Sequence, residues 1–490
     1  MKKYILNICF VLCCSLIFTV LYAFRQKSIQ EGKSEQLFSV SEAYNRITNM
    51  YGCFNLLGAD VDLQEKYEET FSLVANSSSE FEYYLAMSKF VAALEDGHAY
   101  CLPPSDSDFI HQVDMGVSYI ENSYVVTRTY DSTVLPLLSK IVKVNGIPVS
   151  EYIDENISEY IGVKTPLSRE SSCAAALSIG PKGEKRTFTI QTPDGIERDV
   201  EIRFSNKIGG QSIRARNLFD MLISNEKIYD SSNFLLYYVK EDLYNCEKVL
   251  HLIVKDLSAD TAELKDEYIS CILPHIESSN GVIIDLRYCR GGNDANGITI
   301  LESFFDKEFN YSSKVLYPVK SNFFDSYSQM IETYGEIIGS SDAKDILLPL
   351  TQGKFVLPAD EILEVFEVEE HFKTPSYNDL LNSIPKTATP AVVLINHLSG
   401  SAVDTVADIA NEMDLTTIGT HTFGATTNLV TVPLKNGYTI AFSSGIRLTA
   451  KGEIIHNNGV PAKIYADYTL NNLSAGIDDY ILKAISELNS

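Results

Sequence analysis

The chain has 490 residues, of which 45% are hydrophobic and 21% are charged, a composition typical of a globular protein with two or three domains. Its formal net charge of -25 argues against a nucleic-acid partner, because binding to phosphate requires clustered Lys and Arg. The nine cysteines form no C-x-x-C pair and have no histidine nearby at metal-ligand spacing, which argues against a structural zinc site.

Residues 1–23 have the pattern of a signal peptide or an N-terminal membrane anchor. Lys2 and Lys3 form a basic start, and residues 4–24 carry no charge and are about as long as a bilayer span. Since the cleavage site before residue 24 is mediocre, both removal and retention of this segment stay open. In either case we expect an exported protein, periplasmic or associated with the cell envelope of a bacterium, with residues 24–40 as a polar tether.

Residues 41–105 are predicted to form a helical N-terminal cap. Ser79 and Glu82 fit a capping box, and apolar residues follow at helical spacing as far as Leu94. We expect Gly97 to end the helix as a left-handed C-cap, which would place His98 outside it. A histidine at such a position is more often a surface residue than a catalytic base, so its role depends on its partner.

Residues 106–205 read as short strands and turns. Within them, Ile141 to Val149 (IVKVNGIPV) resembles a signature of PDZ domains, which offer a sheet edge to an extended peptide. The sequence therefore predicts a PDZ-like β-rich domain here, with a generic small β-domain as the alternative.

From residue 206 to residue 490 the pattern is that of a larger α/β region. Gly281 to Leu286 reads as a buried strand, and Gly291 and Gly292 follow it. Paired glycines let backbone amides approach a ligand closely, so one of them could donate to an oxyanion; a glycine turn without chemistry is the alternative. We interpret residues 307–389 as an insertion that forms a lid or a substrate wall.

The stretch from 390 to 424 carries the strongest chemical signal. A predicted strand, Ala391 to Asn396, precedes a predicted helix, Ala402 to Met413, and Ser401 lies in the turn between them. Such a turn places its side chains at the carboxyl edge of a sheet and in front of the positive end of the helix. Ser401 is thus a candidate nucleophile, but with Asp404 it also fits a helix capping box, which is commoner.

Three groups of residues, taken together and in this order, resemble the C-terminal processing (tail-specific) serine peptidases. They are Asp285-Leu286-Arg287 with Gly291-Gly292, Ser399-Gly400-Ser401-Ala402, and Thr422-Phe423-Gly424. The resemblance implies an α/β fold with a crotonase-like (ClpP/crotonase) peptidase core, an N-terminal helical cap and a PDZ-like domain. It also implies that Ser401 is the nucleophile and that the amides of Ala402 and of Gly291 or Gly292 form the oxyanion hole.

The candidate base departs from the best-known branch of that family. That branch has a lysine after T-F-G, where this chain has Ala425. Instead, Leu94 to Ala99 (LEDGHA) resembles the branch similar to the tricorn core protease, in which a histidine at this point is the base. The resemblance therefore implies a Ser401–His98 pair. The closing motif, which begins at His456, lacks its usual acid. The residue that would complete a catalytic triad with Ser401 and His98 therefore stays open among three candidates: Asp96, Glu453 and Asn457.

These expectations combine into one functional hypothesis. The chain would be an exported serine endopeptidase acting on unfolded or C-terminally captured polypeptides, with a Ser-His pair and no metal or organic cofactor. Membrane association through residues 4–24 and the oligomeric state are left open. The alternative is a catalytically inactive family member that binds a peptide or another ligand.

Overall fold

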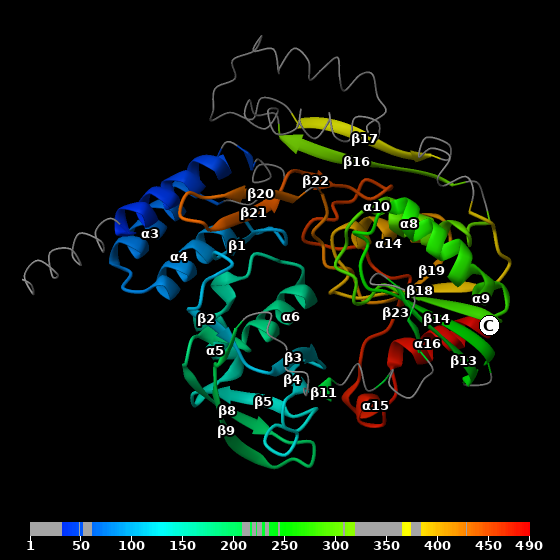
Figure 1. Ribbon diagram of the computed structural model, residues 1–490, viewed down its shortest axis with the longest axis horizontal. Coiled ribbons are helices and arrows are strands. Elements are labelled where there is room, and N and C mark those ends of the chain that lie inside the picture. The colour runs from blue at the N-terminus through cyan, green and yellow to red at the C-terminus, as the bar shows by residue number, and fades with distance from the viewer. Residues whose placement is uncertain are drawn as a thin grey trace, which may run out of the picture.

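The structure is a computed structural model that describes residues 32–48, 50–51, 61–207, 216–217, 222, 228–230, 235–243, 246–306, 309–318, 365–373, 384–427 and 429–490. The targeting segment and residues 319–364 of the expected insertion lie outside these ranges. No helix within them is both long enough and apolar enough to cross a bilayer. In Figure 1 the N-terminal helices lie beside a β-rich region, and an α/β region with a large sheet lies across from both.

A mixed sheet of seven described strands forms the centre of the α/β region, and the α/β class is confirmed. The strand order is β12-β13-β14-β15-β18-β19-β23, and the four neighbouring pairs from β14 to β23 are parallel. Their apolar runs fit strands that are covered on both faces. The strands are β12 (Ile228–Asp230), β13 (Leu235–Leu243), β14 (Cys246–Val254), β15 (Gly281–Asp285), β18 (Ala391–Ile395), β19 (Thr416–Gly419) and β23 (Ile464–Tyr465).

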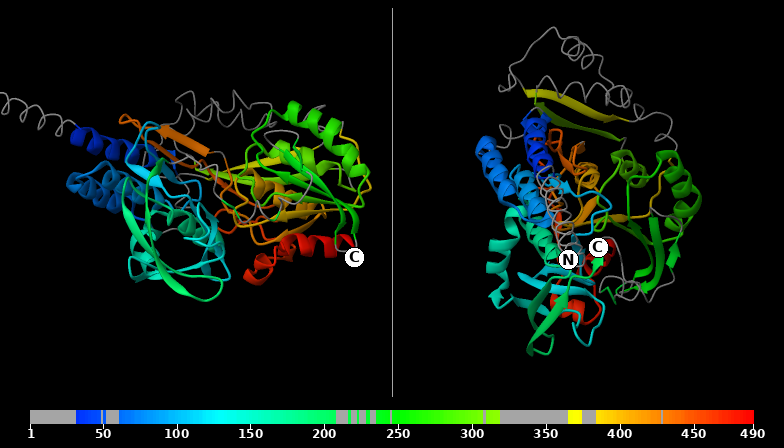
Figure 2. Two further views of the ribbon diagram at one scale, coloured as in Figure 1. Left: turned by 60° about the horizontal axis from the view of Figure 1, so that its bottom comes forward. Right: turned by 60° about the vertical axis from the view of Figure 1, so that its left-hand side comes forward.

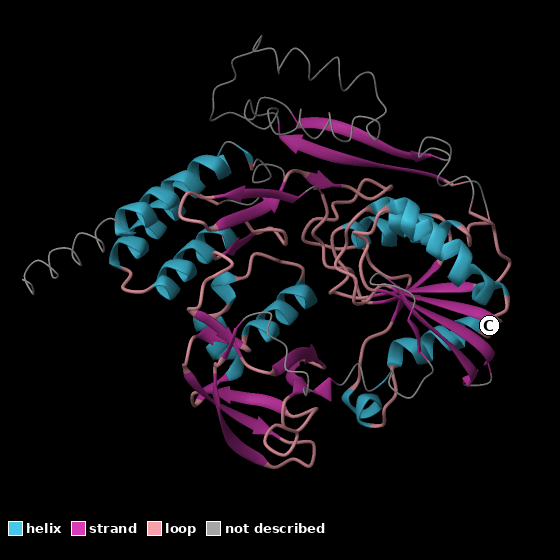
Figure 3. Cartoon of the chain, viewed as in Figure 1, coloured by secondary structure: helices cyan, strands magenta, loops and turns pink. Residues whose placement is uncertain are grey.

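Helices cover both faces of this sheet (Figure 3). Alternate residues of β15 point to opposite sides, so Val282 and Ile284 pack with one cluster of helices and Ile283 packs with another. The first cluster contains α8 (Thr261–Glu267), the π-helical turn Tyr268–Ile272, α9 (Leu273–Glu277), α10 (Asp294–Glu302) and α14 (Ala402–Glu412), and the second contains α15 (Leu470–Ser474) and α16 (Asp479–Leu488). Between α8 and α9 the helix passes through the π-helical turn, just before Pro274, which removes a backbone donor.

A buried charge network fastens the end of β15 to α16. Arg287 is fully buried; its Nε donates to Asp285 at 2.9 Å, and its Nη1 donates to Asp478, the N-cap of α16, at 2.9 Å. Burial raises the pKa of Asp285, but Arg287 and His251 more than offset this, so the pKa lies below its usual range. These contacts give the Asp-Leu-Arg motif a structural role.

The β-rich region is a second sheet with two main helices. Its strand order is β11-β4-β5-β8-β9, with β3 beside β4 and β6 beside β5. The predicted turn Asn145-Gly146 is confirmed, with φ values of 51° and 81° that suit a two-residue hairpin. Bounds are β3 (Met115–Ile120), β4 (Ser123–Thr129), β5 (Lys140–Val144), β6 (Ile147–Pro148), α5 (Val149–Asn156), the 3-10 turn Ser158–Tyr160, α6 (Pro166–Ala176), β8 (Lys185–Gln191), β9 (Glu197–Arg203) and β11 (Arg216–Asn217). The PDZ-like assignment stays a prediction.

This region also contacts the α/β region directly. Thr165, the residue before α6, donates through Oγ1 to the Phe423 carbonyl at 2.8 Å. One turn later Ser168 Oγ donates to the His397 carbonyl at 2.9 Å. The start of α6 is thereby fixed against loops that follow β18 and β19. A small sheet of β10 (Asn206–Lys207), β2 (Ile110–Gln112) and β7 (Ile179–Pro181) completes the region.

The N-terminal segment is helical over residues 32–48 and in α3 (Leu63–Asn76) and α4 (Glu80–Ala92). The first of these helices begins inside the segment expected to be a tether, because Val40, Ala43 and Ile47 recur at helical spacing and are buried against α4. The predicted cap at Ser79 is confirmed, since its side chain accepts from the Glu82 amide at 3.2 Å.

One strand joins the N-terminal segment to the late part of the chain. β1 (Tyr100–Leu102) pairs antiparallel with β21 (Thr439–Ser443), which also pairs with β20 (Leu429–Pro433). Figure 2 shows these late strands, in orange, beside the blue N-terminal helices. The remaining described strands form the ribbon β16 (Asn310–Pro318) and β17 (Val365–Lys373), which is attached through β22 (Ile446–Arg447).

Close packing of α10 on α14 gives a stability test. A Cβ added to Gly297 would lie 2.2 Å from Val406 Cγ2, so we expect Gly297→Ala to lower the free energy of unfolding by about 1–3 kcal/mol. The matched control is Gly32→Ala, another helical glycine, where an added Cβ would have no atom of a described residue within 4 Å. Thermal unfolding should show a lowered midpoint for the first variant only; equal midpoints for both would contradict the packing described.

Candidate active site

Ser401 occupies a strained turn between β18 and α14. Its φ of 57° and ψ of -123° lie in a region that residues other than glycine rarely adopt. The side chain makes no capping hydrogen bond to α14, so the capping-box interpretation of Ser401 and Asp404 is wrong. A strained strand-turn-helix junction with an uncommitted hydroxyl is the geometry of a nucleophile elbow.

The backbone on both sides fixes this turn. Ser399, which is fully buried, donates through Oγ to the Leu286 carbonyl at 2.9 Å and accepts from the Asn396 amide at 3.0 Å. The Ser401 amide donates to the Ala425 carbonyl at 2.9 Å. The first serine of the Ser-Gly-Ser run is therefore structural, and the second remains partly exposed.

Gly291 lies directly beside Ser401. A Cβ on Gly291 would lie 2.6 Å from Ser401 Cβ and 2.9 Å from the Ala402 nitrogen, so only glycine fits there. The Leu257 amide donates to the Gly291 carbonyl at 3.0 Å, and the Asn293 amide donates to the Leu257 carbonyl at 2.9 Å. This parallel bridge turns the amide of the intervening Gly292 away from Leu257.

Three backbone amides at this point have no acceptor among the described residues: those of Gly291, Gly292 and Ala402. The Ala402 amide is the first donor of α14, where a helix leaves its amides unsatisfied and carries partial positive charge. Of the two glycines named from the sequence, Gly291 provides the close approach to Ser401, and the bridge geometry favours the amide of Gly292 as the donor. Both oxyanion-hole expectations stay predictions.

His98 follows α4, but the helix ends differently from the prediction. The left-handed residue is Glu95, with φ of 53°, and the expected left-handed C-cap at Gly97 is wrong. Gly97 is needed for a different reason: an added Cβ would lie 2.7 Å from Ala425 Cβ and 2.8 Å from Phe423 Cε1. The loop that carries His98 thus packs directly on the loop that binds the Ser401 amide.

Gly97, the residue before His98, and the amide of Ser401 both contact Ala425, so His98 and Ser401 lie on neighbouring loops. No hydrogen bond joins these two described residues. Catalytic hydrogen bonds are often long or poorly aligned before substrate binds. The packing also accounts for the residue types, since Gly97 and Ala425 together leave no room for a long side chain between them.

The imidazole of His98 contacts a serine from the other end of the chain. Extending the β1–β21 register by two residues places His98 opposite Ser443, and Nδ1 lies 3.1 Å from Ser443 Oγ. Ser443 in turn donates to Asp96 through Oγ at 2.9 Å and through its amide at 2.7 Å. Burial lowers the pKa of His98, Asp96 raises it, and His456 lowers it; the net shift is downward.

Asp96 is the only one of the three candidate third members that reaches His98 through described hydrogen bonds. Its Oδ1 also accepts from the His98 amide at 2.8 Å. Asn457 instead donates through Nδ2 to the Glu95 carbonyl at 2.6 Å and so fastens the loop before His98, and Glu453 is exposed. The sequence analysis did not identify Ser443, which is the last residue of β21.

Asp404 was also missed, since the sequence suggested only a capping acid. Its fully buried carboxylate accepts from Thr422 Oγ1, from the Gly424 amide at 2.9 Å and from the Ala425 amide at 3.2 Å. Burial raises the pKa of Asp404 to about 7, against the opposing effect of these donors. Asp404 thereby fixes the Thr-Phe-Gly-Ala loop beneath Ser401.

The described residues form no cluster of metal ligands, and most of their free cysteines are buried. Within the described ranges, no group of three or more His, Cys, Asp or Glu side chains is arranged to hold a metal ion. Cys101, Cys173 and Cys289 are buried free thiols, whereas Cys271 is free but exposed. Cys53 lies outside the described residues, as does the side chain of Cys246.

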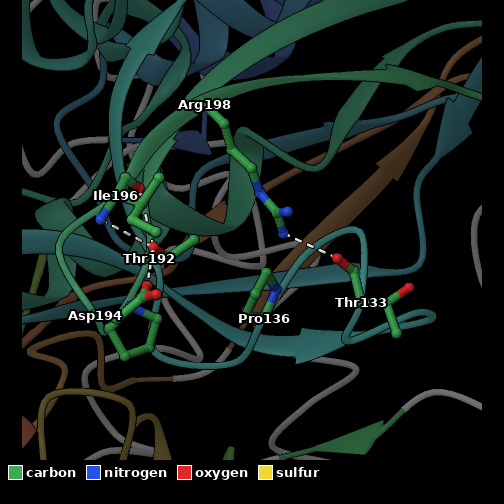
Figure 4. A pocket seen from close by; sticks show the side chains of 7 residues that line it. Thr133, Pro136, Thr192, Asp194, Ile196 and Arg198 are labelled. Carbon is green, nitrogen blue, oxygen red and sulfur yellow. Dashed lines mark hydrogen bonds between the residues drawn. The ribbon is translucent and has the colours of Figure 1, made fainter.

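A pocket of about 410 Å³ lies in the β-rich region (Figure 4). Its walls come from the β4–β5 loop, the β8–β9 turn and Arg198 of β9. Arg198 donates to the carbonyls of Thr133 and Val134, at 2.9 and 3.0 Å, so its guanidinium is used in closing the pocket wall. The pocket therefore contributes no group to the candidate active site.

Residues 251–466 match the model of peptidase family S41. The structure of mature CPAF complexed with lactacystin is similar over 93% of this chain and 98% of that chain, with a TM-score of 0.68 and 14% identity. A second structure of mature CPAF has a TM-score of 0.66, 16% identity, and coverage of 93% and 96%. For the photosystem II D1 C-terminal processing protease the values are 0.42, 14%, 88% and 93%. No curated protein sequence matches the chain.

The family match spans the elements that position the candidate site in the α/β region, including β15, Gly291, Ser401 and Asp404. The similarity to CPAF extends the shared fold over nearly the whole chain. Residues 251–466 therefore form a peptidase family S41 region, and the chain is a serine-type peptidase.

Proposed function

We propose that this chain is an exported endopeptidase whose nucleophile is Ser401 and whose general base is His98. The observation that carries the proposal is the strained turn at Ser401, whose side chain makes no capping hydrogen bond and whose neighbour Ala402 has an amide without an acceptor among the described residues. Strain of this kind persists only where the surrounding structure imposes it, and it concentrates at functional sites. Nothing in the described residues favours the alternative of a non-catalytic binder.

The reaction would proceed through an acyl-enzyme. His98 takes the proton of Ser401 Oγ as the oxygen attacks the peptide carbonyl, and the amides of Ala402 and Gly292 donate to the developing oxyanion. The protonated His98 then gives its proton to the leaving amine. Water, activated by the same imidazole, releases the acyl group and restores the serine. A lowered pKa suits His98 to this role, because the imidazole is then neutral at pH 7.

The substrate would be an extended polypeptide, such as an unfolded chain or one held near its C-terminus. Support comes from the β-rich region, where α6 packs along β3 and begins at the loops around Phe423 and His397. A peptide bound to a sheet edge there would be held close to the catalytic loops. Export to the periplasm or cell envelope, with residues 4–24 as signal or anchor, belongs to the same proposal.

A fluorophosphonate probe tests the nucleophile. The purified chain should be labelled on Ser401, and Ser401→Ala should abolish labelling, because the probe needs an activated hydroxyl beside oxyanion donors. His98→Ala should slow labelling by roughly 10²-fold or more, the usual contribution of general-base catalysis. Ser399→Ala tests the turn but not the chemistry and should keep Ser401 as the labelled residue. Labelling of Ser401→Ala at the rate of the unsubstituted chain would contradict the proposal.

The pH dependence tests the base. Since His98 must be neutral and its pKa is lowered, kcat/KM should rise with pH through a midpoint below pH 6.5 and stay high at neutral pH. The control is His275→Gln on α9, which should leave the midpoint unchanged. A midpoint well above 6.5 would be inconsistent with His98 as the base in this environment.

A further inference from the structure

We propose that Ser443 and Asp96 are positioning residues that hold His98 as the tautomer with the proton on Nδ1. They would replace the acid that the closing motif lacks. This inference rests on the proposed function, in which His98 is the base. It adds an orienting pair that the sequence did not reveal, because Ser443 lies 345 residues from His98.

The directions of the hydrogen bonds determine which ring nitrogen of His98 carries the proton. A carboxylate only accepts, so the Ser443 hydroxyl proton points to Asp96 Oδ1 at 2.9 Å. Ser443 Oγ has no second proton and must accept at its other contact, which is His98 Nδ1 at 3.1 Å. The imidazole therefore carries its proton on Nδ1, and Nε2 keeps the lone pair that a base needs.

The same carboxylate also fixes the backbone of this histidine. Asp96 Oδ1 accepts from the His98 amide at 2.8 Å, and Oδ2 accepts from the Ser443 amide at 2.7 Å. Both Asp96 and Ser443 are fully buried, so water does not compete for these bonds. Asp96 thus binds the main chain of His98 directly and its ring through one hydroxyl.

The titratable groups that face His98 are Asp96 and His456. His456 stands where the closing motif usually has its acid; it is buried, and its Nε2 lies 3.5 Å from Asp96 Oδ1. The negative charge that stabilises an imidazolium at His98 therefore comes from the N-terminal side, from Asp96. An orienting acid of this kind holds the tautomer and stabilises the protonated ring without itself taking the proton.

Kinetics of three variants and one control test the proposal. Ser443→Ala and Asp96→Asn should each lower kcat by roughly 10²- to 10⁴-fold with KM little changed. Each variant no longer holds His98 as the tautomer with the proton on Nδ1, but it keeps the contacts with the substrate. The double variant should be no slower than the slower single variant, as expected for residues that act as one unit. Ser444→Ala removes a neighbouring buried hydroxyl that has no hydrogen-bond partner among the described residues and should keep full activity.

Two readouts separate positioning from a general loss of structure. Asp96 raises the pKa of His98, so Asp96→Asn should move the acid limb of kcat/KM to lower pH, which unfolding would not do. Nitrogen NMR of labelled histidine in the Ser401→Ala chain should show His98 protonated on Nδ1, and this state should be lost when Ser443→Ala is added.

The outcomes distinguish the two proposals. Full activity of Ser443→Ala, or a proton on Nε2 of His98, would overturn the positioning role and leave the Ser401–His98 pair standing. A chain that neither hydrolyses peptides nor reacts with the fluorophosphonate would overturn the proposed function, while the NMR measurement would still decide the tautomer.

Discussion

The antiparallel pairing of β1 with β21 is the interaction on which the candidate site depends. Two segments more than 300 residues apart in sequence meet in one register, and that register alone places His98 opposite Ser443. The strands are held by the hydrophobic cluster that contains residues of α4 together with Cys101, Ile440 and Phe442. The alignment of the His98 imidazole therefore depends on the packing of the N-terminal helices. A shift of the register by one residue would turn the strand's core side chains outward and separate the two groups.

The second constraint is the loop from Thr422 to Ala425. Asp404 binds it from below, Thr165 of the β-rich region binds it from the side, and it binds the Ser401 amide. The loop that carries His98 packs on its remaining face through Gly97. Three regions of the chain thus converge on four residues, which explains why a small residue, Ala425, stands where the lysine branch of the family has its base.

Much of this could be predicted from the sequence, because the signals were local. The strand, turn and helix around Ser401 and the glycine pair beside it follow from apolar patterning and residue types. What the sequence could not supply depends on long-range register or on close contact: the partner of His98, the structural reason for Gly97, and the carboxylate of Asp404 beneath the loop. The strained backbone of Ser401 was likewise not predictable, since Ser401 and Asp404 fit a capping box equally well.

The most direct test of the central claim is a crystal structure of the chain after reaction with diisopropyl fluorophosphate. The account predicts a covalent bond to Ser401 Oγ and a phosphoryl oxygen bound by the amides of Ala402 and Gly292. It also predicts His98 Nε2 within hydrogen-bond reach, about 2.6–3.2 Å, of the Ser401 oxygen. An adduct on another residue, or an imidazole that stays out of reach of Ser401 in the adduct, would contradict it.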